Sequence, residues 1–106
     1  MKEIEKKILH SFKLLLSQRV ALHRIVVYGS RARGDAEPES DMDVLVVLNG
    51  PNTAKARRHI NDCAWEAGFE YGLVISPVTV SRNNWENGPE KYSLLAQAVE
   101  EEGIAV

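Results

Sequence analysis

Residues 25–48 read IVVYGSRARGDAEPESDMDVLVVL, and this stretch decides how the chain folds. Two apolar runs, residues 25–28 and 44–48, enclose a polar middle. The first run ends at Gly29-Ser30, ten residues follow, and the second run is introduced by Asp41-Met42-Asp43. Short apolar runs bounded by turn residues are typical of buried strands. The stretch therefore predicts two core strands with both polar motifs at their ends.

The flanking sequence alternates between helical and extended patterns. Apolar residues at helical spacing predict helices over about residues 2–19 and 53–67, and a last helix from Gly88-Pro89 to about residue 102. Residues 69–80 read as an extended segment whose proline favours an edge position. The order α-β-turn-β-α-β-α predicts an α/β (α+β) fold, a small mixed β-sheet flanked by helices.

Length and composition are those of one domain over residues 1–106. Hydrophobic residues make up 44% of the chain, charged residues 26%, and the net charge is −2, so no general attraction to nucleic acid is expected. The longest apolar run, residues 44–48, is too short to span a bilayer. Cys63 is the single cysteine, which fits a cytoplasmic protein, and it lies on the apolar side of its predicted helix.

The Gly-Ser turn has the residues that bind phosphate. Gly29 lacks a Cβ and lets the backbone approach an anion closely. Ser30 is expected to cap one helical turn that ends before Gly34, and its amides offer N–H donors to an anion. Arg31 and Arg33 add positive charge nearby. The predicted nucleotide-binding residues are therefore Gly29, Ser30, Arg31 and Arg33.

The two aspartates are predicted to be metal ligands and catalytic residues. Asp41 and Asp43 stand two apart at a strand start, so both side chains leave the same face, with alpha carbons about 7 Å apart. Carboxylates at this spacing can converge on two ions about 3.5–4 Å apart. Without cations the two charges repel and raise at least one pKa. Magnesium is favoured because it binds one or two carboxylates while substrate phosphates complete its octahedron.

At this spacing the two motifs resemble the signature of minimal nucleotidyltransferases (MNT), small relatives of the DNA polymerase β superfamily. The resemblance is specific over residues 25–48. It implies that Gly29 and Ser30 hold the triphosphate of ATP, and that Asp41 and Asp43 bind magnesium for in-line attack of a hydroxyl on the α-phosphate. Prokaryotic proteins similar to this chain often act as antitoxins that adenylylate a tyrosine of a HEPN-family ribonuclease toxin. ATP and a HEPN partner are thus implied, without direct contact to nucleic acid or a membrane.

The family normally adds a third carboxylate from a neighbouring strand, and here the chain departs from the pattern. Glu70 is the only acid in residues 70–78, so either Glu70 completes the site or no residue does. A missing third acid would affect activation of the acceptor hydroxyl most. The alternative function is then a nucleotidyltransferase-like interaction module that neutralises a partner by binding. The three histidines lack the spacing of a metal site, and no pattern specifies an oligomeric state.

Overall fold

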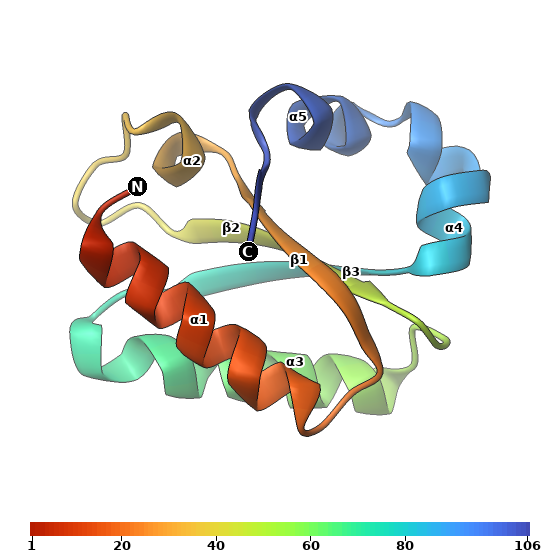
Figure 1. Ribbon diagram of the computed structural model, residues 1–106, viewed down its shortest axis with the longest axis horizontal. Helices are drawn as coiled ribbons and strands as arrows, with labels where there is room; N and C mark the ends of the chain where they lie inside the picture. The colour runs from red at the N-terminus through yellow and green to blue at the C-terminus, as the bar shows by residue number, and fades with distance from the viewer.

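The computed structural model describes all 106 residues, and Figure 1 shows a twisted sheet with helices packed on both of its faces. The elements, in chain order, are α1 (Glu3–Ser17), β1 (Leu22–Tyr28), α2 (Ser30–Arg33), β2 (Met42–Leu48), α3 (Ala54–Gly68), the 3₁₀ turn η1 (Phe69–Tyr71), β3 (Ile75–Ser81), α4 (Arg82–Asn87), the 3₁₀ turn η2 (Pro89–Tyr92), α5 (Leu94–Glu102) and β4 (Ile104–Ala105). The strand order is β3-β2-β1-β4. β2 and β3 run parallel, whereas β1 is antiparallel to both β2 and β4, which confirms the predicted mixed sheet.

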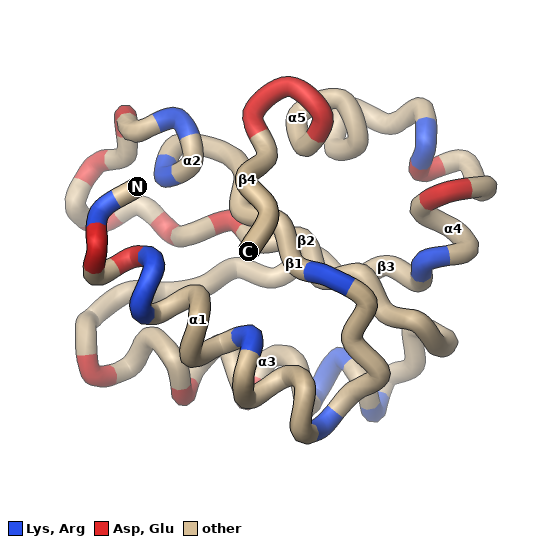
Figure 2. Tube along the Cα trace, viewed as in Figure 1, with Lys and Arg blue, Asp and Glu red and all other residues tan.

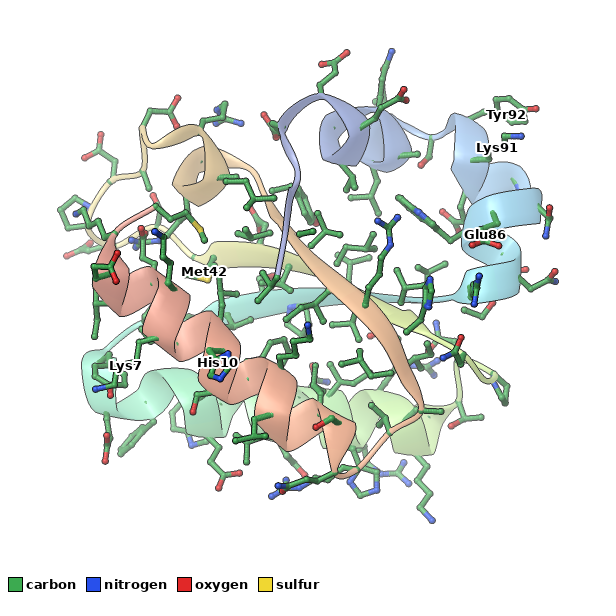
Figure 3. The ribbon with its side chains drawn as sticks, in the orientation of Figure 1. Lys7, His10, Met42, Glu86, Lys91 and Tyr92 are labelled. Carbon is green, nitrogen blue, oxygen red and sulfur yellow. The ribbon has the colours of Figure 1, made fainter.

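The two faces of the sheet carry cores of different size. Successive side chains of β2 point to opposite faces. Met42, which Figure 3 labels, and Val44 belong to a cluster of 15 buried residues shared with α1 and α3. Leu45 and Val47 belong to a cluster of 5 buried residues, which includes Val99 of α5. The same alternation puts Asp43 on the α5 side, so the predicted site lies on the face with the smaller core.

The first half of the chain follows the sequence prediction closely. β2 ends with the apolar run at Leu48 and begins two residues before it at Met42, and α1 and α3 fall within about two residues of their expected bounds. Thr53 caps α3, its hydroxyl accepting a hydrogen bond from the Ala56 N–H. Cys63 is buried in the larger core, as expected. β1 starts three residues earlier than the predicted residue 25.

The second half departs from it in three places. Residues 69–74 are not extended: α3 passes into η1, and a Cβ on Gly68 would lie 2.0 Å from the Leu73 carbonyl oxygen, which shows how tightly the chain turns there. The predicted last helix is divided, because the Ser93 hydroxyl caps a new helix at the Ala96 N–H. Tyr92, which falls within the span of the predicted helix, is 85% exposed.

The third departure is β4, a strand of two residues that pairs with Val26 and Val27 of β1. A segment this short carries no periodicity that a sequence pattern could register. β3, with Pro77 inside it, forms the opposite edge of the sheet as predicted. None of the helices combines the length and the apolar character needed to cross a membrane.

Candidate active site

The Gly-Ser turn and the second aspartate meet at one end of the sheet. Tyr28, the last residue of β1, is paired with Asp43 of β2, so Gly29 follows directly beside that aspartate. Gly29 has φ 76° and ψ −158°, a conformation essentially restricted to glycine. A Cβ there would lie 2.6 Å from Oδ2 of Asp43. The carboxylate therefore packs against the bare backbone of the turn, and any side chain at residue 29 would displace it.

Asp41 and Asp43 have different environments. Asp41 is exposed and lies just before β2. Asp43 is half-buried and is the second residue of β2. Burial raises the pKa of the Asp43 carboxyl, and the negative charges of Asp41 and Glu102 raise it further, while Arg33 opposes them. A bound cation would offset this repulsion, because it favours both ionised carboxylates.

The donor set fits a metal that is shared with a substrate. No group of three or more His, Cys, Asp or Glu residues is arranged to hold a metal ion. Two carboxylates alone supply hard oxygen ligands, which suit magnesium, but they leave most of an octahedron open. Phosphate oxygens at the neighbouring Gly29 turn would be placed to fill part of it. The residues thus fit a magnesium–nucleotide complex better than a metal cage built from protein ligands.

The turn after β1 is the short helix α2, as predicted, but its cap differs. Gly29 rather than Ser30 is the N-cap residue, and no side chain caps this helix. The Arg33 N–H donates to the Gly29 carbonyl over 3.0 Å, which closes the single turn. Gly34 ends it in the left-handed conformation with φ 84°, as expected.

Arg31 does not lie where the sequence placed it. Its side chain is buried and forms an ion pair with Glu5 of α1, with 3.0 Å between Nη1 and Oε2. It also donates to the carbonyls of Ser40 (2.6 Å) and Pro38 (3.1 Å). The prediction that Arg31 contacts phosphate is therefore corrected: its donors are already used to join α1, α2 and the loop before β2.

The side chain of Arg33 is half-exposed and contacts the end of α5 rather than α1. It donates to Oε2 of Glu102 over 2.9 Å and to Asp35 over 3.2 Å. The Gly29 N–H donates to Oε1 of the same Glu102 over 3.0 Å. The hydrogen bond from Arg33, followed by that from Gly29, holds the pKa of the Glu102 carboxyl below its usual range. Figure 2 shows acidic residues at the end of α5 and basic residues on α2, the two elements that this ion pair joins.

Sequence reasoning did not identify Glu102. It stands at the end of a helix, in a run of three glutamates that reads as a solvated surface. The sequence offers only an indirect sign that Glu102 has a partner, because carboxylates are unfavourable at a helix C-terminus.

The third acid is absent from the neighbouring strand. Ser76 is the residue of β3 paired with Asp43, so a serine occupies the position from which a third carboxylate would face the site. Glu70 lies in η1, exposed beside Trp65 and Phe69 on the α3 side of the sheet. It is therefore on the layer opposite Asp43 and does not complete the site.

The Gly-Ser turn packed on the second carboxylate of an Asp-x-Asp strand start, in a mixed α/β fold, agrees with the resemblance to nucleotidyltransferases. The nucleotidyltransferase domain model matches residues 6–105, and the chain belongs to this family. It is 34% identical over 76 residues to "Putative protein adenylyltransferase MJ0141" of Methanocaldococcus jannaschii, a match that covers 72% of this chain and 75% of that protein. A second relative from this organism, "Putative protein adenylyltransferase MJ1305", is 38% identical over 58 residues. The match covers 53% of this chain and 40% of the relative. The family and these relatives accordingly support a transferase of nucleotidyl groups.

Solved structures share the fold at lower identity. One chain of a toxin–antitoxin crystal structure with AMP-PNP aligns with a TM-score of 0.64 and 19% identity, covering 91% of this chain and 69% of the other. A chain from the complex of tri-AMPylated Shewanella oneidensis HEPN toxin with MNT antitoxin aligns with a TM-score of 0.57 and 18% identity, covering 96% of this chain and 70% of the other. At these identities the similarity establishes the fold.

Proposed function

We propose that this chain is a magnesium-dependent protein adenylyltransferase that transfers AMP from ATP to a hydroxyl of a partner protein, as the antitoxin of a HEPN/MNT pair. The observation that carries the proposal is the contact between Gly29 and Asp43, which joins the phosphate turn to a metal-binding carboxylate. The adenylyltransferase names of the relatives support the reaction. The toxin–antitoxin structures with the same fold support the type of partner.

In this proposal each residue has one role. The backbone at Gly29 and Ser30, together with Arg33, binds the triphosphate. Asp41 and Asp43 would hold magnesium, which would neutralise charge on the phosphates and lower the pKa of the attacking hydroxyl. The hydroxyl oxygen forms a bond to the α-phosphorus while the bond from that phosphorus to the bridging oxygen breaks. Pyrophosphate leaves, the hydroxyl proton passes to solvent, and AMP remains on the acceptor.

A binding module without turnover is the second candidate, and Ser76 favours it. With serine in place of an acid beside Asp43, the sheet offers no third carboxylate to accept the proton of the acceptor hydroxyl. Such a protein would still bind nucleotide through the Gly29 turn, and it would neutralise its partner by covering it.

One experiment separates the two functions. The chain is incubated with magnesium, ATP labelled on the α-phosphate and a candidate partner protein of the HEPN family, and label on that protein is measured. We expect labelled partner with wild-type protein, loss of label with Asp41→Ala/Asp43→Ala, and retention with Glu39→Ala, an exposed acid of the same loop. Full neutralisation of the partner by the double variant, with no label transferred by any variant, would establish the binding module instead.

A further inference from the structure

The carboxylate of Glu102 occupies donors that the proposed function assigns to phosphate. Its two oxygens accept hydrogen bonds from the Gly29 N–H and from Arg33, at 3.0 and 2.9 Å. A backbone N–H and a guanidinium converging on one anion form the arrangement that binds a phosphate oxygen. In this structure the anion is a side chain of the protein itself.

The sheet fixes the position of Glu102 from the far end of the chain. β4 pairs with β1 in the register Val27↔Ile104 and Val26↔Ala105. Glu102, the last residue of α5, stands two residues before Ile104, and Gly29 stands two residues after Val27, so this pairing brings the end of α5 close to the turn. Gly103 lets the chain close onto β1, since a Cβ there would lie 2.8 Å from Cγ1 of Val26. The contact therefore follows from backbone pairing and close packing as well as from charge attraction.

The end of α5 is otherwise a poor place for this charge. Three glutamates form the last turn of the helix, and no basic residue accompanies them. The C-terminus of a helix carries partial negative charge, so these carboxylates weaken it. Glu102 alone of the three has partners that offset this effect, and its side chain is 22% exposed, compared with the exposed Glu101.

We infer that Glu102 is an internal substitute for phosphate, which holds the donors of the Gly29 turn in place and sets the affinity for nucleotide because ATP must displace it. The inference rests on the proposed function, since it concerns the same donors. Arg33 is half-exposed on a four-residue helix, and the Glu102 carboxylate borders solvent, so rotation of side chains suffices for the exchange. A magnesium-bound triphosphate offers several phosphate oxygens to these donors, and its metal would add contacts to the Asp41 and Asp43 carboxylates, so it can displace Glu102.

The test is the affinity for magnesium–AMP-PNP, measured by isothermal titration calorimetry on the full chain. Glu102→Ala and Glu102→Gln are compared with Glu101→Ala and Glu101→Gln, which remove the same charge one residue away without touching the turn. When only a fraction of the molecules has the Gly29 and Arg33 donors free of Glu102, the apparent affinity for nucleotide falls by that fraction. We expect Glu102→Ala to bind at least about fivefold more tightly than wild type, and the Glu101 variants to stay within about twofold.

A second readout does not depend on nucleotide. In a ¹⁵N-labelled sample without ligand, the Gly29 amide should shift and exchange with solvent faster in Glu102→Ala than in Glu101→Ala. Unchanged or weaker AMP-PNP binding by Glu102→Ala, with a folded spectrum, would overturn the inference, and it would do so even if adenylyl transfer is normal. Tighter AMP-PNP binding with no transfer by any variant would instead uphold the inference and refute the proposed transferase.

Discussion

The two faces of the sheet use the arginines of α2 in opposite ways. On the face covered by α1 and α3, Arg31 is buried with Glu5 and serves the packing of three segments. On the face covered by α5, Arg33 stays half-exposed and pairs with Glu102 beside the aspartates. Two residues of one helical turn thus divide between building the fold and contacting an anion. The position of an arginine in the motif does not show which of these two roles it has. The face of the sheet toward which its side chain points does.

Truncation of Arg31, the buried arginine, is expected to have the largest effect on stability. Arg31→Ala leaves the Glu5 carboxylate buried without its partner, which destabilises by about 3–5 kcal/mol. Urea unfolding measures this change in the free energy of unfolding. Arg33→Ala is the matched control, and we expect it to leave that free energy nearly unchanged while it weakens AMP-PNP binding. Equal losses of stability in both variants would show that the two arginines are not divided in this way.

A second test compares two glycines of the same turn, both with positive φ. Gly29→Ala and Gly34→Ala each introduce backbone strain of about 1–3 kcal/mol. Only Gly29→Ala also pushes against the Asp43 carboxylate, because a Cβ at Gly34 meets nothing within 4 Å. We expect both variants to lower the melting temperature and only Gly29→Ala to abolish AMP-PNP binding and transfer. Equal binding by both variants would contradict the proposed contact.

The acid stability of the chain depends on the buried pair. Burial alone raises the pKa of Glu5, but the hydrogen bonds from the Lys2 N–H and Arg31 outweigh it and hold the pKa below 4.5. A group with a lowered pKa in the folded state adds stability above its unfolded pKa, and this contribution is lost as pH falls through the folded pKa. Wild type should therefore lose more unfolding free energy than Glu5→Gln between about pH 6 and about pH 3. The effect is smaller than that of Arg31→Ala, since a protonated carboxyl still accepts a hydrogen bond; parallel pH curves for the two proteins would refute it.

The smallest effect concerns helix caps on the two faces. Ser93 caps α5 on the face with the smaller core, and Thr53 caps α3 on the face with the larger core. Replacing either with alanine costs about 1 kcal/mol. Because few buried residues hold α5, we expect Ser93→Ala to speed hydrogen exchange locally in α5, whereas Thr53→Ala lowers protection throughout the chain. Identical exchange patterns would show that both faces unfold as one unit.

Much of this arrangement could be predicted from the sequence where the pattern was local. The apolar run located β2, and the spacing of the two aspartates predicted that both leave one face; the structure then places Asp43 beside Gly29. Residues whose roles depend on distant partners could not be found in this way. Arg31 looked like a phosphate ligand until α1 brought Glu5 to it, and Glu102 looked like surface until β4 set its register. The third acid was sought in Glu70, but only the parallel pairing of β2 with β3 identifies Ser76 as the residue beside Asp43.

The edges of the sheet have a consequence for how the molecule meets others. Pro77 lies within β3, the strand at one edge, and proline offers no N–H to an added strand. The other edge is β4, whose two residues are too few to template a ladder. A strand added along β3 at Pro77, or along β4, would therefore gain few backbone hydrogen bonds. At these two places recognition of a partner is left to side chains.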